Sequence, residues 1–170
     1  LYRLKENFGH LVFWKNKEIY NKYSKGYYVV TDHDIVPIEE CPKDFLLHFK
    51  NILEHNHNLT KVGFSLKLDD IPDTNPKKKK ILEWESRFWN IQNKEGIYPT
   101  AIDTTFALYK PNYMYKEQNF YAAIRTKVPY QATHGGWYID SEKLTNEQKY
   151  YFANCNESSS WKMDDKGVLY

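Results

Sequence analysis

The sequence contains no hydrophobic run long enough to cross a membrane. A spanning helix needs about 18 or more consecutive apolar residues, and polar or charged residues interrupt every apolar stretch of this chain. The first residues also lack the regions of a secretory signal. We therefore expect a protein of the cytoplasm, either free or peripherally attached to a membrane, with no transmembrane segment.

Cysteine is scarce, with two residues in a chain of 170. Cys41 and Cys155 lie far apart, and their spacing matches no metal-binding motif. Such a pair is typical of reduced thiols in an intracellular protein, although a single disulfide between them is the alternative.

Several catalytic motifs are also missing. The chain has no glycine-rich phosphate loop, no G-x-S-x-G, no HExxH and no cysteine cluster. Their absence argues against nucleotide hydrolases, esterases and zinc proteases. The 24 basic and 22 acidic residues leave a formal charge of +2. We expect no nucleic-acid partner, because a protein that binds nucleic acid through its phosphates carries a larger positive charge.

What the chain does contain is an alternation of strand and helix patterns within a length that suits a single domain, residues 1–170. Periodicity predicts helices over 1–23, 45–53, 81–91 and 140–152, and strands over 27–31, 61–68 and 100–109. This order predicts an α/β sandwich in which helices flank one mixed, mainly parallel sheet. Aromatic residues make up 17% of the chain, and they serve as core fillers or as stacking surfaces for sugars and bases.

A pair of carboxylates follows the first predicted strand. The apolar run 27–31 ends in Asp32-His33-Asp34, at the kind of strand end where α/β sheets bind ligands. Carboxylate oxygens there would hold a hard divalent cation and, through it, phosphate oxygens. His33 should point to the opposite side of an extended backbone. The alternative is an ordinary turn or a helix cap, which Asp also favours.

A late histidine is the second candidate ligand. His134 precedes Gly135-Gly136, which allow backbone to approach a ligand closely, and Trp137-Tyr138, which would stack on one. Imidazole together with carboxylates suits Mn²⁺ better than Mg²⁺. The alternative is a histidine with a purely structural hydrogen bond.

Two further acids are candidates for the chemistry itself. Asp103 lies within a strand-like run, where a carboxylate is costly unless it is paired or used. Glu85 shares a helix face with Phe88 and Trp89, and apolar neighbours raise the pKa of a general base. Hydrogen bonding of Asp103 to a threonine, and solvation or arginine pairing of Glu85, are the alternatives.

Basic side chains supply candidate phosphate contacts. The guanidinium of Arg125 is suited to phosphate oxygens, and Lys127 is a second candidate. The run 77–80, four lysines, is typical of a solvated loop. Its alternative use is attraction to an anionic membrane or to a phosphate-bearing acceptor.

Taken in order, these segments resemble GT-A fold glycosyltransferases of a small bacterial and viral subgroup. The resemblance rests on Asn7-x-Gly9, on the strand that ends in Asp32-His33-Asp34, and on the stretches 84–89, 102–109 and 125–138. In that family the DxD motif binds a divalent metal and the diphosphate of a nucleotide sugar. The usual first βα unit, which grips the base, is not visible after Leu1, so we expect it to be absent or to precede this chain.

The resemblance implies roles for individual residues. Asp34 would be the firmest metal ligand, and Asp32 would touch the metal or the donor sugar. His134 would complete the metal site, and Asp103 would lie near the donor sugar or the acceptor, with Glu85 as the second catalytic candidate. The resemblance also implies a set of substrate-binding residues, namely Asn7, Asp32, Arg125, Tyr130 and Trp137.

The resulting expectation is a metal-dependent glycosyltransferase, with Mn²⁺ preferred over Mg²⁺. It would transfer a hexose or deoxyhexose from a UDP-, GDP- or dTDP-linked donor to a glycan or another hydroxyl acceptor, in a bacterial or virus-infected cell. Further domains of the same polypeptide are expected as partners. The alternatives are a carbohydrate-binding module that keeps this fold without catalysis and, with less support, a metal-dependent phosphoesterase.

Overall fold

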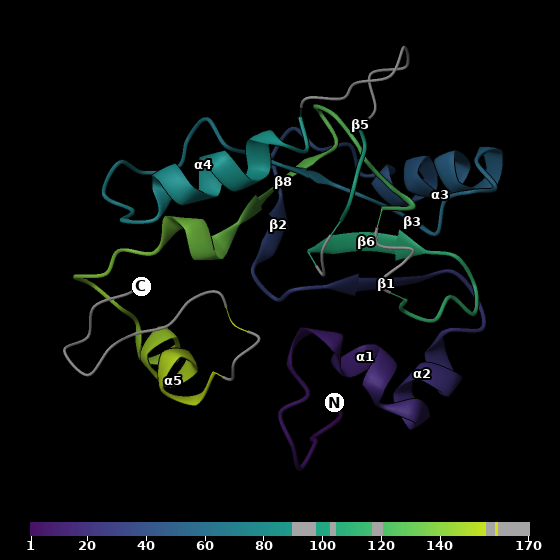
Figure 1. The fold of residues 1–170 in the computed structure, drawn as a ribbon, viewed down its shortest axis with the longest axis horizontal. Helices are drawn as coiled ribbons and strands as arrows, with labels where there is room; N and C mark the ends of the chain where they lie inside the picture. The colour runs from purple at the N-terminus through teal and green to yellow at the C-terminus, as the bar shows by residue number, and fades with distance from the viewer. Residues whose placement is uncertain (90–97, 103–104, 117–120, 156–158, 160–170) are drawn as a thin grey trace.

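The computed structural model describes residues 1–89, 98–102, 105–116, 121–155 and 159, and in it the chain forms a mixed α/β structure with two mixed sheets (Figure 1). In the described part of the chain, no helix is both long enough and apolar enough to cross a membrane.

The larger sheet has five strands in the order β1-β6-β3-β7-β5. These are β1 (Tyr28–Thr31), β6 (Phe106–Tyr109), β3 (Lys61–Gly63), β7 (Ala123–Arg125) and β5 (Tyr98–Pro99). Only β3 and β7 pair in parallel, and the other neighbours are antiparallel.

The smaller sheet has three strands in the order β2-β8-β4. They are β2 (Ile35–Pro37), β8 (Gln131–His134) and β4 (Ser65–Leu66). Strand β8 pairs antiparallel with β2 and parallel with β4. The chain passes from the larger to the smaller sheet three times, at 32–34, at Phe64 and at 126–130.

The mixed α/β class is confirmed, but the expectation of one mainly parallel sheet is wrong. The run 61–68 alternates like a single strand, yet Phe64 divides it between the two sheets. Strand β6 enters between β1 and β3 and is antiparallel to both. Strand direction depends on the route of the connections, which hydrophobic periodicity does not report.

Apart from the helix predicted over 45–53, the helices in the described residues are shorter than the sequence pattern suggested. They are η1 (Gly9–Leu11), α1 (Val12–Lys15), α2 (Lys17–Tyr23), α3 (Phe45–His55), α4 (Lys78–Ser86), η3 (Gly135–Tyr138) and α5 (Asn146–Asn154). The expected helix 1–23 is broken because Asn16 adopts extended backbone and caps α2, accepting the Ile19 N–H. Three of the four consecutive lysines lie inside α4 and not in a loop.

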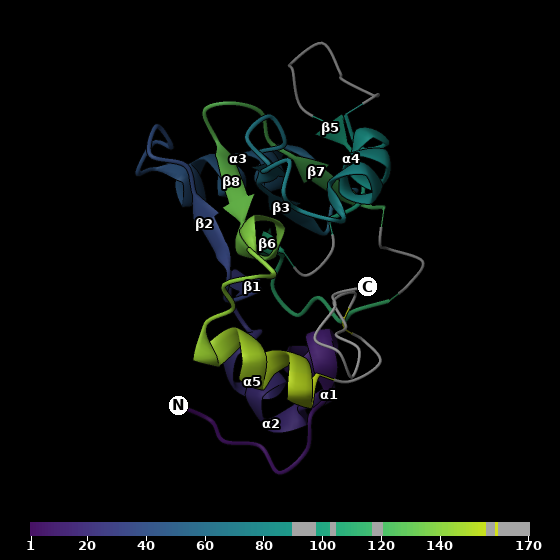
Figure 2. The same ribbon diagram turned by 90° about the vertical axis from the view of Figure 1, so that its left-hand side faces the viewer.

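The helices cover different parts of the sheets. Helix α3 packs against β3 and β6, and Figures 1 and 2 show α1, α2 and α5 gathered on the β1 side of the molecule, opposite α3 and α4. Phe49, Leu53, Val62 and Phe64 form the centre of the main core, and each is at most 1% exposed.

A second core accounts for much of the tyrosine content. The rings of Tyr28 and Tyr109 stack at 5.3 Å, and Trp14 packs on Tyr109. The Tyr28 hydroxyl donates to the carbonyl of Tyr113 at 2.7 Å, and it accepts from the indole of Trp14 at 3.3 Å. Tyr28 and Tyr109 are therefore core fillers, and the hydroxyl of Tyr28 finds its partners inside the protein.

Gly63 lies where two strands approach each other closely. A Cβ atom at this position would lie 2.0 Å from the Phe106 carbonyl oxygen, which belongs to the backbone of β6. We predict that Gly63→Ala lowers the free energy of unfolding by about 2–4 kcal/mol, because the strands must move apart. Urea denaturation measures the change.

The matched control is Gly26→Ala, since nothing lies within 4 Å of a Cβ there. It should change the free energy of unfolding by less than about 0.5 kcal/mol. Equal stability of the two variants would contradict the close approach of β3 and β6.

Candidate functional site

The two carboxylates lie in the turn that carries the chain from one sheet to the other. Asp32 follows β1, and its backbone N–H donates to the Thr105 carbonyl at 2.9 Å. Asp34 precedes β2, and the Ile35 N–H lies 3.4 Å from the Asp32 carbonyl oxygen. The turn is therefore tied to the segment that leads into β6.

Asp34 and His134 meet at this junction although 100 residues separate them. The antiparallel register of β2 and β8 places Ile35 opposite His134. Asp34 Oδ2 lies 3.2 Å from His134 Nδ1 and accepts the Gly136 N–H at 2.8 Å. The Gly135 N–H donates to the Asp34 carbonyl at 2.8 Å. The two residues expected to share a metal are thus neighbours.

Asp34 is held in its anionic form. Burial would raise its pKa, but the side-chain contact with His134, the charge of that ring, the Gly136 N–H and the charge of His33 together lower the pKa from 3.8 to about 2. Hydrogen bonds and positive charge both favour the ionised carboxylate. The site therefore presents a negative charge at neutral pH.

His134 is held in place by an aromatic neighbour. Its ring stacks on Trp137 with the centroids 5.0 Å apart and the planes 7° apart. Trp137 is 6% exposed, and its carbonyl accepts from Asn75 Nδ2 at 2.6 Å. The nearby Asp34 carboxylate is not aligned as an acceptor, so the buried Nδ1 of His134 makes no hydrogen bond to a described group.

These donors fit part of a divalent metal site. A carboxylate and a buried imidazole nitrogen without a hydrogen bond are suitable ligands for Mn²⁺. Among the described residues, however, no three His, Cys, Asp or Glu side chains gather closely enough to hold a metal by themselves. Asp34 and His134 would provide two ligands, and Asp32 or ligand oxygens would have to provide the others.

Glu85 and Arg125 come together elsewhere, as a buried ion pair. Arg125 Nη1 lies 2.6 Å from Glu85 Oε2, with the side chains 3% and 5% exposed. Arg125 also donates to the Ala101 carbonyl at 2.8 Å, and its guanidinium lies 4.2 Å from the centre of the Phe88 ring. Both side chains are enclosed, and they fasten α4 to β7.

Lys61 is a buried cation that the sequence did not single out. The residue is 1% exposed, and its ammonium donates to the Ile102 carbonyl. Arg125 and Lys61, from the parallel strands β7 and β3, therefore hold two successive carbonyls. A lysine within a strand pattern is typical of a solvated position, so only the tertiary structure reveals this role.

The remaining candidates are scattered. Asn7 accepts the Gly9 N–H in an N-terminal turn. Tyr130 lies near the opposite end of β8 from His134, where it stacks on His48 and donates to Asp44. Asp103 lies outside the described residues.

Two neighbours of the turn were missed by the sequence analysis. The ring of Tyr151, on α5, lies 6.4 Å from that of His33. Thr105 is 7% exposed, and its hydroxyl finds no hydrogen-bond partner among the described residues. Neither residue belongs to a motif that would have identified it.

The pKa of Asp34 leads to a testable pH dependence. The carboxylate titrates near 3.8 when unfolded and near 2 in the fold, so its stabilising effect is present above pH 4 and disappears as the pH falls to about 2. We predict that Asp34→Asn lowers the free energy of unfolding by about 2 kcal/mol at pH 7, and by progressively less between pH 4 and pH 2. Urea denaturation across this range measures both values.

The control is Asp69→Asn, at a side chain that is 82% exposed. It should change the free energy of unfolding by less than about 0.5 kcal/mol at every pH. If Asp34→Asn lowered the free energy of unfolding by the same amount at every pH down to 2, the lowered pKa of Asp34 would be contradicted.

The buried ion pair yields a second prediction. Arg125→Met or Glu85→Met should lower the free energy of unfolding by about 3–5 kcal/mol, because each leaves one buried charge without its partner. The double variant should lose clearly less than the sum. The exposed pair Lys50–Glu54, with side chains 43% and 42% exposed, is the matched control and should couple by less than about 1 kcal/mol. If the double variant lost as much free energy of unfolding as the two single variants together, the pairing of Glu85 with Arg125 would be contradicted.

Comparison of the chain with models of protein families, with curated proteins and with solved structures gives no match. The case for a function therefore rests on the residues themselves. It rests above all on the anionic Asp34, on His134 with its buried nitrogen, and on the turn that joins the two sheets.

Proposed function

We propose that the protein is a metal-dependent glycosyltransferase that moves a hexose or deoxyhexose from a nucleoside diphosphate sugar to a hydroxyl of a glycan. The observation that carries this proposal is the contact of Asp34 Oδ2 with His134 Nδ1 at 3.2 Å. It joins a strand-end DxD motif to a late histidine, as the resemblance to GT-A enzymes leads one to expect. The GT-A fold is part of the same proposal.

The cation in this proposal is Mn²⁺ in preference to Mg²⁺. Mg²⁺ strongly prefers an all-oxygen shell, whereas Mn²⁺ accepts imidazole beside carboxylates. The metal would stabilise the negative charge that develops on the departing diphosphate. Because two protein ligands leave room in the coordination shell, oxygens of the donor itself would complete it.

The chain's own residues have distinct tasks in this proposal. Asp34 stays ionised at neutral pH, with its pKa near 2. Trp137 fixes the plane of the His134 ring by stacking on it. The amides of Gly135 and Gly136 hold the Asp34 carbonyl and carboxylate in place. The ligand atoms are therefore preorganised, and little reorganisation is required when the donor binds.

The acid near the anomeric carbon remains a prediction. Asp103 is the first candidate. It directly follows Ile102, whose carbonyl accepts a hydrogen bond from the Lys61 ammonium. Glu85 is the second candidate, but its carboxylate is bound to Arg125 and is 5% exposed. Arg125 could bind phosphate only if its ion pair with Glu85 opened. The described contacts therefore favour Asp103 over Glu85.

The test compares Asp34→Ala with the exposed-site control Asp69→Ala. Release of nucleoside diphosphate is measured over a panel of UDP-, GDP- and dTDP-sugars with Mn²⁺, together with the thermal shift that Mn²⁺ and donor produce. We predict that Asp34→Ala lowers turnover at least about 100-fold and removes the Mn²⁺-dependent shift, which reports binding by mass action. The control should behave like the unaltered protein.

Two outcomes would overturn the proposal. The first is a folded protein that releases no nucleoside diphosphate from any donor with Mn²⁺ present. The second is a thermal shift with Mn²⁺ that Asp34→Ala leaves unchanged. Glycan binding that survives Asp34→Ala without any turnover would instead identify a carbohydrate-binding module.

A further inference from the structure

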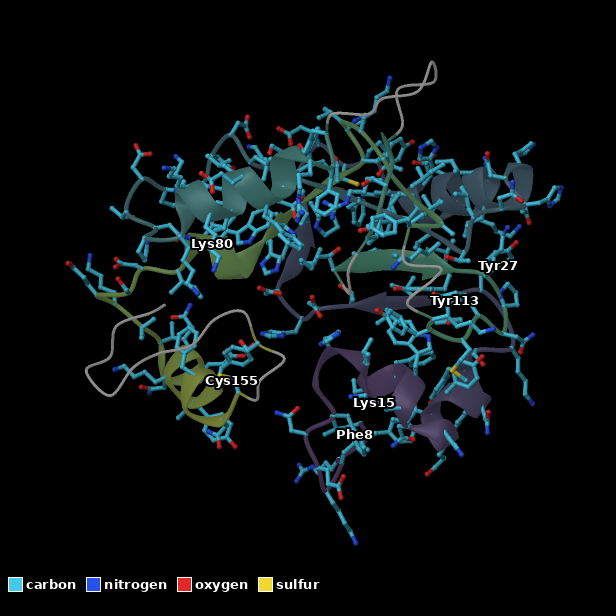
Figure 3. The ribbon with its side chains drawn as sticks, in the orientation of Figure 1. Phe8, Lys15, Tyr27, Lys80, Tyr113 and Cys155 are labelled. Atoms are coloured by element: carbon cyan, nitrogen blue, oxygen red, sulfur yellow. The ribbon has the colours of Figure 1, made fainter. Side chains whose placement is uncertain are left out.

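One face of α4 combines positive charge with an exposed aromatic ring. Lys80 and Trp84 belong to α4, and Arg87 is its C-cap with helical backbone. Their spacings of four and three residues place all three on the same side of the helix. The buried residues of α4, Ile81 and Glu85, face the protein. Figure 3 labels Lys80 on this helix. We propose that this face docks on a membrane surface that contains anionic lipids, independently of the catalytic proposal.

The aromatic residue is unusually accessible. Trp84 is 57% exposed, although burying so large a ring would be favourable. The Arg87 guanidinium lies 3.8 Å from the centre of the Trp84 ring, and Arg87 Nε donates to the Trp84 carbonyl at 3.1 Å. A cation and an indole are thus presented together, as in the residues that anchor proteins at the headgroup level of a bilayer.

The charge of this face is only partly neutralised by the protein. The Lys78 ammonium forms an ion pair with Asp73 at 2.7 Å, and the Lys79 ammonium lies 4.0 Å from the Glu83 carboxylate. Lys80 has no carboxylate partner among the residues that the structure describes. Burial and then the charge of Lys80 lower the pKa of Lys77, so these two ammonium groups are near enough to repel each other. An approaching anionic surface would relieve that repulsion.

A lipid surface suits this face better than a nucleic acid does. Nucleic-acid binding depends on many phosphate contacts, and the whole chain carries a formal charge of only +2. A bilayer interface needs only a few cations and one amphipathic ring. Lysine and arginine can also bury their alkyl chains there while the charged ends stay at the headgroups.

The same helix is fastened to the candidate site. Asn75, just before α4, donates to the Trp137 carbonyl, and Tyr138 donates to Asp70 in the same loop. Trp137 in turn stacks on His134. Docking of α4 would therefore hold the Asp34–His134 site at a fixed position near the membrane.

The experiment uses the full chain and vesicles of phosphatidylcholine with or without phosphatidylglycerol, and it measures the co-sedimented fraction. The double variant Lys80→Glu/Arg87→Glu is compared with Lys25→Glu/Lys43→Glu, which makes the same change in net charge at exposed positions away from α4. We expect binding only to anionic vesicles. The α4 variant should lower the partition coefficient at least about 20-fold, at about fivefold for each cation, and the control variant should lower it only slightly.

Trp84 provides an independent spectroscopic readout. Anionic vesicles should shift the tryptophan emission of the unaltered protein to shorter wavelength, and Trp84→Phe should abolish most of this shift while retaining vesicle binding. A milder variant, Lys80→Gln/Arg87→Gln, keeps the test decisive if the charge reversals impair folding, and far-UV circular dichroism checks the fold of each protein.

Three outcomes would overturn the proposal. They are equal binding to neutral and anionic vesicles, an equal loss in the two charge-reversal variants, and an emission shift that persists in Trp84→Phe. If the α4 variant loses affinity for inorganic phosphate or a single-stranded oligonucleotide but keeps its affinity for vesicles, the face serves a soluble anion instead.

Discussion

The antiparallel pairing of β2 with β8 is the constraint on which the candidate site depends. It sets Ile35 opposite His134 and so brings the turn 32–34 against the glycines that follow β8. A register shift of one residue would turn the His134 side chain to the other face of its strand. The carboxylate of Asp34 would then lose the imidazole that lies 3.2 Å away. The pairing is secured further by the bond from Gly135 N–H to the Asp34 carbonyl.

Buried cations secure the surroundings of this junction. Lys61 and Arg125 are 1% and 3% exposed, and each donates to a backbone carbonyl just before the undescribed residues 103–104. On the other side of that gap, the Thr105 carbonyl accepts from Asp32. Ala101 and Ile102 are thus held by charged donors, which bind carbonyls more tightly than neutral ones do, and Thr105 is held by a backbone amide. Such anchoring is what a site needs if its ligand atoms are to be preorganised.

Elements defined by local features could be predicted from the sequence, whereas contacts between distant segments could not. The helix around Phe49 and Leu53 was predicted correctly, because an apolar face is a local feature. The last helix was predicted over 140–152 but begins at Asn146, where Thr145 and Gln148 form a capping box. The run 61–68 was predicted as one strand but crosses between sheets at Phe64. Glu85 was predicted to be a general base beside aromatic residues, with arginine pairing as the alternative, and the structure shows the pairing, with Arg125 from 40 residues away. No local pattern reports a contact at that distance.

The sequence by itself determined the mixed α/β class, the acidic turn after the first strand and the candidacy of Asp34 and His134. These depend on residue type and short-range spacing, which the chain carries directly. Only the tertiary structure decided that there are two sheets, that most strand pairs are antiparallel, and that Asp34 and His134 meet while Tyr130 and Asn7 lie elsewhere. It also decided which charges are buried. The physical reason is that strand partners and burial depend on packing between segments far apart in the sequence. The free energy of that packing cannot be read from any one segment.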